Sequence, residues 1–97
     1  MSVHGEIDLY TVPRLRGELA AALGGGGPVR LIVDLSGVDF CDSTGVNALL
    51  AAHRQAQEAG GDLELAGPRP GVRKILQVTG LESVFTVTDD PARPIGH

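Results

Sequence analysis

The sequence predicts an α/β fold built on a small, largely parallel β-sheet. Three features support this prediction. Short runs of β-branched or alternating apolar residues recur along the chain, and segments with apolar residues at helical spacing separate these runs. Glycine or proline lies near each transition between a run and a helical segment. Strands joined through helices pair mostly in parallel, because each crossover returns the chain in the same direction. At 97 residues, the chain fits a single domain spanning residues 1–97.

The first part of the chain predicts a strand and then a helix. The strand is expected over residues 3–9. Thr11 is the expected N-cap of the helix, and Gly24 is the expected left-handed residue at its C-terminus. Between them, apolar residues recur at helical spacing: Val12, Leu15, Leu19, Ala22 and Leu23.

A second strand and helix follow the break at residues 24–28. The β-branched run over residues 29–35 predicts a mostly buried strand. The next helix is expected to begin at Ser43 or Thr44 and to end at Ala59, before two glycines. One face of this helix carries Val46, Leu49, Leu50, His53 and Ala56.

The last third predicts a strand, a helix and a final strand. Residues 62–66 alternate with a period of two, as in a half-buried strand. The third helix is expected to end at Gly80, and its apolar face carries Val72, Ile75, Leu76 and Thr79. A short strand is expected over residues 84–87, followed by a loosely ordered tail over residues 88–97.

Composition excludes several classes of function. The net charge is −4 and aromatic residues are 3% of the chain, so it has neither the basic surface nor the stacking platforms of a nucleic-acid binder. Cys41 is the only cysteine, and no histidine or carboxylate spacing suggests a metal, so no metal or other cofactor is expected. No apolar run is long enough to span a membrane and no leader is present, so we expect a cytoplasmic protein without direct membrane contact.

The most informative segment lies after the second strand, at residues 38–47. Asp42-Ser43-Thr44-Gly45 before an apolar helix is an ordinary capping sequence, with Ser43 or Thr44 as the cap. The same hydroxyl is also a suitable phosphate-bearing position, because a helix N-terminus tolerates added negative charge. In this interpretation, Gly45 leaves the free backbone N–H groups unshielded, and Asp39 and Asp42 crowd the added charge.

Enzymatic interpretations lack the required residues. The segment around Ser43 has no first glycine of a nucleophile elbow, and His53, on a helix face, is more typical of a half-buried structural histidine than of a base. Cys41 is expected to be a small packed residue rather than a reactive thiol. The glycines at residues 24–27 lack the Lys-Ser or Lys-Thr of a phosphate-binding loop. We therefore expect a protein that is not an enzyme.

At this point the chain resembles a STAS domain of the anti-sigma factor antagonist type. The resemblance extends from about Val3 to Val87. It rests on the order and spacing of Gly5-Glu6-Ile7-Asp8, Leu31-Ile32-Val33-Asp34-Leu35-Ser36-Gly37-Val38, Phe40-Cys41-Asp42-Ser43-Thr44-Gly45-Val46, Leu49-Leu50 with His53, Gly60-Gly61 and Val78-Thr79-Gly80-Leu81.

The resemblance implies a phosphorylation switch. Ser43 would be phosphorylated, with Thr44 as a minor site, by an anti-sigma factor that is itself a serine kinase. The unphosphorylated domain would bind this anti-sigma factor and free the sigma factor, and a serine phosphatase would restore binding. The implied partner-binding residues are Asp8, Asp42, Ser43, Thr44 and Gly45.

The resemblance also implies a mixed, largely parallel sheet with helices packed on one side. The family usually has another strand before the Gly5–Asp8 segment, and here only Met1 to His4 precede it. Either the start of the chain is wrongly assigned, or the sheet edge is open and paired with another chain, so monomer and dimer are both left open. The alternative function is a STAS accessory subunit of a membrane lipid or anion transporter, which needs no phosphorylatable hydroxyl.

Overall fold

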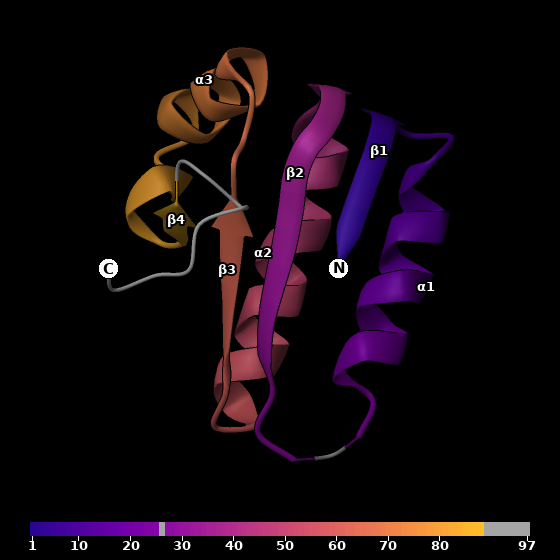
Figure 1. Cartoon of the computed structure of the whole chain (residues 1–97), viewed down its shortest axis with the longest axis vertical. Helices are drawn as coiled ribbons and strands as arrows, with labels where there is room; N and C mark the ends of the chain where they lie inside the picture. The colour runs from indigo at the N-terminus through magenta and orange to yellow at the C-terminus, as the bar shows by residue number, and fades with distance from the viewer. Residues whose placement is uncertain (26, 89–97) are drawn as a thin grey trace.

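Strands and helices alternate along the chain, as the sequence predicts (Figure 1). The computed structural model describes residues 1–25 and 27–88, so the tail after Thr88, expected to be loose, lies outside the described residues. The elements in chain order are β1 (Ser2–Ile7), α1 (Val12–Leu23), β2 (Arg30–Cys41), α2 (Ser43–Glu58), β3 (Asp62–Ala66), α3 (Pro70–Val78), the 3-10 helix η1 (Leu81–Ser83) and β4 (Thr86–Thr88).

The four strands form one sheet in the order β1-β2-β3-β4. All three pairings between described strands are parallel. The predicted α/β class and parallel sheet are therefore confirmed, and an antiparallel strand of the expected mixed sheet is not found among the described residues. Within this order, β1 and β4 are the edge strands and β2 contributes the longest strand.

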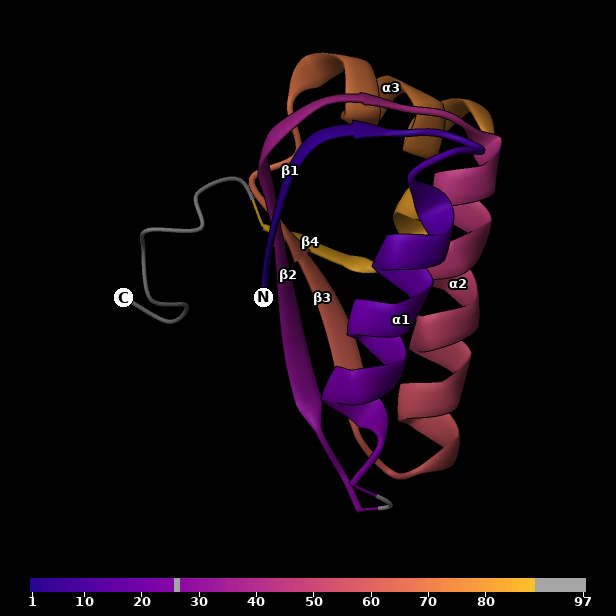
Figure 2. The same ribbon diagram turned by 90° about the vertical axis from the view of Figure 1, so that its right-hand side faces the viewer.

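The helices α1 and α2 lie side by side on one face of the sheet, as Figure 2 shows. The helix α3 lies toward the carboxyl end of the strands. Between sheet and helices is a core of aliphatic side chains, because alternate strand residues and one stripe of each helix turn inward. Its most deeply buried members are Ile7, Leu35, Leu49, Leu63, Leu65, Leu76, Val33, Val38, Val46 and Val72.

The strand β2 is longer than the sequence predicts. The prediction ended this strand at Leu35, whereas β2 continues to Cys41. Pairing with β1 keeps this second half extended: Gly5, Glu6 and Ile7 lie opposite Val38, Phe40 and Cys41, with register shifts along the way. The chain just before the candidate site is therefore a strand rather than a loop, which fixes the place where α2 starts.

The two ends of α1 differ from the prediction in backbone conformation and in hydrogen bonding. Gly80 has φ +74° and follows α3 as expected, but Gly24 has φ −74°, so the predicted left-handed residue after α1 is wrong. Thr11 occupies the N-cap position of α1 but makes no side-chain cap bond. Its hydroxyl instead donates to the Glu6 carbonyl oxygen at 2.9 Å.

The C-terminal part of the described chain departs slightly from the prediction. The short helix η1 was not predicted, and the final strand is found at Thr86–Thr88 rather than at residues 84–87. Phe85 does not belong to the strand; its side chain is buried in the core. The apolar pattern over residues 84–87 therefore reflects the buried side chain of Phe85 next to a strand of three residues.

Candidate functional site

Two chain segments meet at the carboxyl edge of the sheet. The strand β1 ends at Ile7 before the loop over residues 8–11, and β2 ends at Cys41 just before Asp42 and α2. Ile7 lies opposite Cys41, and the Asp42 backbone N–H donates to the Ile7 carbonyl oxygen at 3.1 Å. The loop and the start of α2 are therefore neighbours, and together they contain Asp8, Asp42, Ser43, Thr44 and Gly45.

Asp42 caps α2, so the prediction of Ser43 or Thr44 as the cap is wrong. Its Oδ1 atom accepts hydrogen bonds from the backbone N–H groups of Thr44 at 3.0 Å and Gly45 at 3.3 Å. The Thr44 hydroxyl donates to the same oxygen. These hydrogen bonds stabilise the charged carboxylate and lower the pKa of Asp42 below its ordinary value. The bond from the Thr44 hydroxyl has the largest effect, and the bonds from the two N–H groups have smaller ones.

Ser43 is the first residue of α2, and its side chain is exposed. Within the described part of the chain, its hydroxyl has no hydrogen-bond partner. Thr44 differs on both counts, because it is half-buried and its hydroxyl is bonded to Asp42. Of the two neighbouring hydroxyl groups, only that of Ser43 is both accessible and unengaged.

Gly45 serves a packing role rather than the predicted unshielding of backbone N–H groups. The residue is buried, and a Cβ atom at this position would lie 2.4 Å from Ile7 Cγ2 and 2.7 Å from Cys41 Sγ. The Gly45 N–H group is already bonded to the carboxylate of Asp42. A glycine is required because the first turn of α2 lies directly against the ends of β1 and β2.

Asp8 organises the loop between β1 and α1. Its Oδ1 atom accepts from the backbone N–H groups of Tyr10 at 2.9 Å and Thr11 at 3.0 Å. Its own N–H donates to the Thr11 hydroxyl at 2.9 Å. The carboxylates of Asp8 and Asp42 are thus both bonded to donors of their own chain, at neighbouring positions of one sheet edge.

Leu9 and Tyr10 were not predicted to be site residues. Both lie in the loop beside the start of α2, and 66% of Leu9 and 89% of Tyr10 is exposed. The sequence does contain a signal: an apolar residue and the chain's only tyrosine are adjacent, outside any predicted core face. That signal was not used because residue 9 was assigned to the end of a strand.

Cys41 is buried at the end of β2. Burial, and then the neighbouring carboxylate of Asp42, raises the pKa of the Cys41 thiol to about 11. The thiol is therefore protonated near neutral pH, and a protonated thiol is a poor nucleophile. This supports the interpretation of Cys41 as a packed residue.

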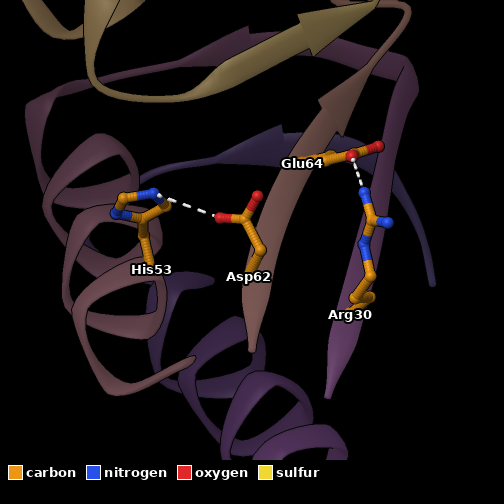
Figure 3. Close-up of polar contacts among 4 residues, drawn as sticks. All are labelled: Arg30, His53, Asp62 and Glu64. Carbon is orange, nitrogen blue, oxygen red and sulfur yellow. Dashed lines mark hydrogen bonds and ion pairs between the residues drawn. The ribbon is translucent and has the colours of Figure 1, made fainter. Parts of the chain in front are cut away.

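His53 lies in the second half of α2, away from the candidate site. It is buried rather than half-buried as expected, with only 4% exposed, and its ring packs edge-on against Phe85. Its Nε2 atom lies 3.6 Å from Asp62 Oδ1 (Figure 3). Glu64, on the same strand as Asp62, accepts a hydrogen bond from Arg30 of β2 at 2.8 Å, as Figure 3 also shows. Both contacts join elements of the fold rather than residues of the site.

The part of the chain that the structure describes holds neither a candidate metal site nor a candidate membrane-spanning helix. Within it, no group of histidine, cysteine and acidic residues is arranged to hold a metal ion. Among the same residues, no helix combines the length and the apolar character needed to cross a membrane.

A family model described as "Mlab, STAS domain" matches residues 1–88 of the chain. The chain belongs to the STAS domain family. This STAS domain is 35% identical over 77 residues to the anti-sigma F factor antagonist of Lysinibacillus sphaericus, which covers 79% of this chain and 66% of that protein. It is 27% identical over 88 residues to the anti-sigma-B factor antagonist of Bacillus subtilis, which covers 91% of this chain and 79% of that protein.

Solved structures of STAS domains share the fold. An anti-sigma factor antagonist from Mycobacterium paratuberculosis matches with a TM-score of 0.80 at 32% identity, over 94% of this chain and 74% of that chain. The anti-sigma factor antagonist SpoIIAA in its unphosphorylated form matches with a TM-score of 0.75 at 29% identity, over 89% of this chain and 75% of that chain. The phosphorylated form of SpoIIAA, from Bacillus, matches with a TM-score of 0.68 at 28% identity, over 89% of this chain and 78% of that chain.

A transporter-related protein shares the fold as well. A sulfate transporter family protein from Wolinella succinogenes matches with a TM-score of 0.78 over 94% of this chain and 75% of that chain. Its identity to this STAS domain is 22%, so the likeness concerns the fold alone. The relatives at higher identity are named as anti-sigma factor antagonists.

Proposed function

We propose that this STAS domain is an anti-sigma factor antagonist that is switched by phosphorylation of Ser43. In its unphosphorylated form it binds an anti-sigma factor that is a serine kinase, and this binding frees a sigma factor. Phosphorylation ends the binding, and a serine phosphatase restores it. The observation that carries the proposal is the exposed, unbonded hydroxyl of Ser43 at the first residue of α2.

The likeness to named antagonists supports this function over an accessory role in a membrane lipid or anion transporter. The relatives include antagonists of anti-sigma F and anti-sigma-B factors, and one structural match is a phosphorylated antagonist. An accessory subunit would not require a free hydroxyl at the start of α2. In a phosphorylated antagonist, that hydroxyl is the acceptor of the phosphate.

Ser43 rather than Thr44 is the proposed acceptor. In the phosphoryl transfer, Oγ of the serine forms a bond to the γ-phosphorus of ATP, the bond to the leaving ADP breaks, and the hydroxyl proton is released. The Thr44 hydroxyl would first have to leave Asp42, and the cap of α2 would lose a hydrogen bond. The Ser43 hydroxyl reacts without breaking any contact of the described chain.

The charge of the phosphate explains how binding is switched off. A phosphoserine adds about 1.5 to 2 negative charges near neutral pH. Two of the backbone N–H groups at the start of α2 already bind the carboxylate of Asp42, so they are not free to balance this charge. A partner that buries this edge would have to desolvate an uncompensated dianion beside a carboxylate. A loss of about 4 kcal/mol would weaken the affinity roughly a thousandfold.

Phosphorylation by a purified kinase tests the proposed function. The full chain is incubated with ATP and each purified anti-sigma-class serine kinase of the source organism, and the products are mapped by mass spectrometry. We expect one phosphate, on Ser43, for at least one kinase. A purified serine phosphatase should remove it.

Two substitutions control the phosphorylation experiment. Ser43→Ala should accept no phosphate, whereas Thr44→Ala should still accept one on Ser43. A phosphate found on Thr44 would contradict the assigned acceptor. Wild-type protein that no such kinase phosphorylates would support the transporter accessory role instead.

A further inference from the structure

We propose that Leu9 and Tyr10 are the anchors through which the protein partner that recognises Ser43 is held. We call these two residues the anchor pair. The partner is a protein that offers an apolar pocket to both side chains. This inference rests on the proposed function, because it names the binding surface of the same partner.

The exposure of the anchor pair has no explanation within the fold. The chain has three aromatic residues apart from histidine, and one of them, Phe85, is buried. Tyr10 is 89% exposed, its neighbour Leu9 is 66% exposed, and Phe40, two residues before Asp42, is 52% exposed. Adjacent exposed apolar side chains mark interaction surfaces, and tyrosine is enriched among the residues that dominate binding energy.

The loop that carries the anchor pair is held in one conformation. The Asp8 carboxylate binds the N–H groups of Tyr10 and Thr11, and the Asp8 carbonyl oxygen accepts from the N–H of Val12 at 2.8 Å. The Thr11 hydroxyl ties the loop back to Glu6 at 2.9 Å. A loop ordered before binding loses little conformational entropy in the complex, so its side chains are effective anchors.

The anchor pair and Ser43 belong to one edge of the molecule. The strand ends that carry them are joined by the hydrogen bond from the Asp42 N–H to the Ile7 carbonyl oxygen at 3.1 Å. The helices that follow, α1 and α2, lie side by side in both views (Figures 1 and 2). A protein that covers the Ser43 side chain therefore reaches the loop over residues 8–11.

The chemistry of this edge favours an apolar pocket over a basic one. The carboxylate of Asp8 is bonded to N–H groups of its own loop, and that of Asp42 to N–H and hydroxyl groups of α2. Carboxylates with such partners have little need of a cation from another protein. What the polar contacts of this edge leave unpartnered is exposed apolar area, and Leu9 and Tyr10 are more exposed than Phe40. Burial of this apolar area favours association.

Binding of the kinase that phosphorylates Ser43 tests the anchor pair. Wild-type and variant chains are titrated by calorimetry into that kinase in the presence of ADP, so that no phosphate is transferred. We expect Tyr10→Ala to weaken binding about thirtyfold and Tyr10→Phe to retain most of the affinity. Leu9→Ala should also weaken binding. In the kinase reaction, Tyr10→Ala should raise KM for the domain and leave kcat unchanged.

Val78→Ala is the matched control, because Val78 is an apolar residue of α3 that is 76% exposed. It should bind like the wild type, and thermal melting should show the same Tm for all variants. Unchanged affinity of Tyr10→Ala and Leu9→Ala for a kinase that binds wild type would overturn the anchor pair alone.

Two further outcomes also overturn the anchor pair. If no kinase binds or phosphorylates the wild type, the proposed function fails and the anchor pair fails with it. If sedimentation shows a wild-type dimer that Tyr10→Ala dissociates, the occupant of this surface is a second copy of the chain.

Discussion

Asp42 and Ser43 are neighbours in the sequence, but only Asp42 caps the helix α2. The carboxylate of Asp42 satisfies backbone N–H groups at the start of α2, and the hydroxyl of Ser43 makes no hydrogen bond with the described chain. Because the cap does not depend on Ser43, a chemical change of this serine leaves the helix start intact. This separation is what a switch requires if it is to alter binding and not folding.

The cap predicts a specific pH dependence of stability. Asp42→Ala removes the acceptor of two N–H groups, so its Tm should be lower than that of the wild type. The pKa of Asp42 is lowered in the folded protein, so its charge stabilises the fold above the unfolded pKa of about 3.9. That contribution is lost as the pH falls through the lower folded pKa. The Tm difference should therefore be constant near neutral pH and shrink below about pH 4.

Asp42→Asn is the control for this titration. Asparagine also caps helices well, so this variant should keep most of the stability near neutral pH. It has no charge to lose, so its Tm relative to the wild type should improve in acid. A Tm difference between wild type and Asp42→Ala that stays the same down to pH 2 would show that the charged carboxylate does not contribute.

At the scale of elements, the site depends on how closely α2 approaches the sheet. Gly45 lets the first turn of α2 lie against Ile7 of β1 and Cys41 of β2. This contact, together with the pairing of Ile7 and Cys41, sets the position of Ser43 relative to the loop over residues 8–11. Gly45 is therefore a structural residue at a functional edge.

Two alanine substitutions separate packing from helix propensity. Gly45→Ala places a methyl group within 2.4 Å of Ile7 Cγ2, so we expect it to destabilise the fold. Overpacking of this kind costs about 1–3 kcal/mol. Gly17→Ala, in α1 with no atom within 4 Å of the new Cβ, should instead stabilise the fold. The gain for such a change is about 0.4–1 kcal/mol. Urea unfolding of both variants measures the two effects, and a stabilising Gly45→Ala would contradict the packing role.

At the scale of the whole molecule, the core and the proposed binding edge are separate. The core lies between the sheet and the helices α1 and α2, whereas Ser43 and the anchor pair lie outside it. A charge added at the edge therefore needs no repacking of the interior. In the proposed switch, phosphorylation of Ser43 would change the surface of the domain, and the partner would respond to that change.

Ser43→Asp tests this separation. The side chain of Ser43 is exposed and makes no hydrogen bond with the described chain, so the free energy of unfolding should change by less than about 0.5 kcal/mol. The added charge beside Asp42 should weaken binding of the anti-sigma factor at least tenfold, by analogy with phosphate. Calorimetric titration measures the affinity and thermal melting the stability.

Gln77→Glu, which adds the same charge at an exposed position of α3, should leave both the affinity and the Tm unchanged. An unfolded Ser43→Asp variant would mean that residue 43 supports the fold.

Much of the fold could be predicted because its signals are local. The apolar spacing of Leu15 and Leu19 and the alternation over residues 62–66 each reflect one element against one core face, and both elements are found. The length of β2 could not be predicted, since its second half is held extended by pairing with β1, a distant segment. The cap of α2, predicted at Ser43 or Thr44, is Asp42, and the backbone N–H of Asp42 is bonded to the Ile7 carbonyl oxygen at the end of β1.

At the site, the order and spacing of the residues were enough to identify those at the start of α2 and to indicate the family resemblance. The folded chain was needed to show which of these residues are accessible: Ser43 is exposed, the Thr44 hydroxyl is bonded to Asp42, and Gly45 lies against Ile7. The physical reason is that residue type and spacing are local properties of the chain. Exposure and hydrogen-bond occupancy depend on the strand that another part of the chain places alongside.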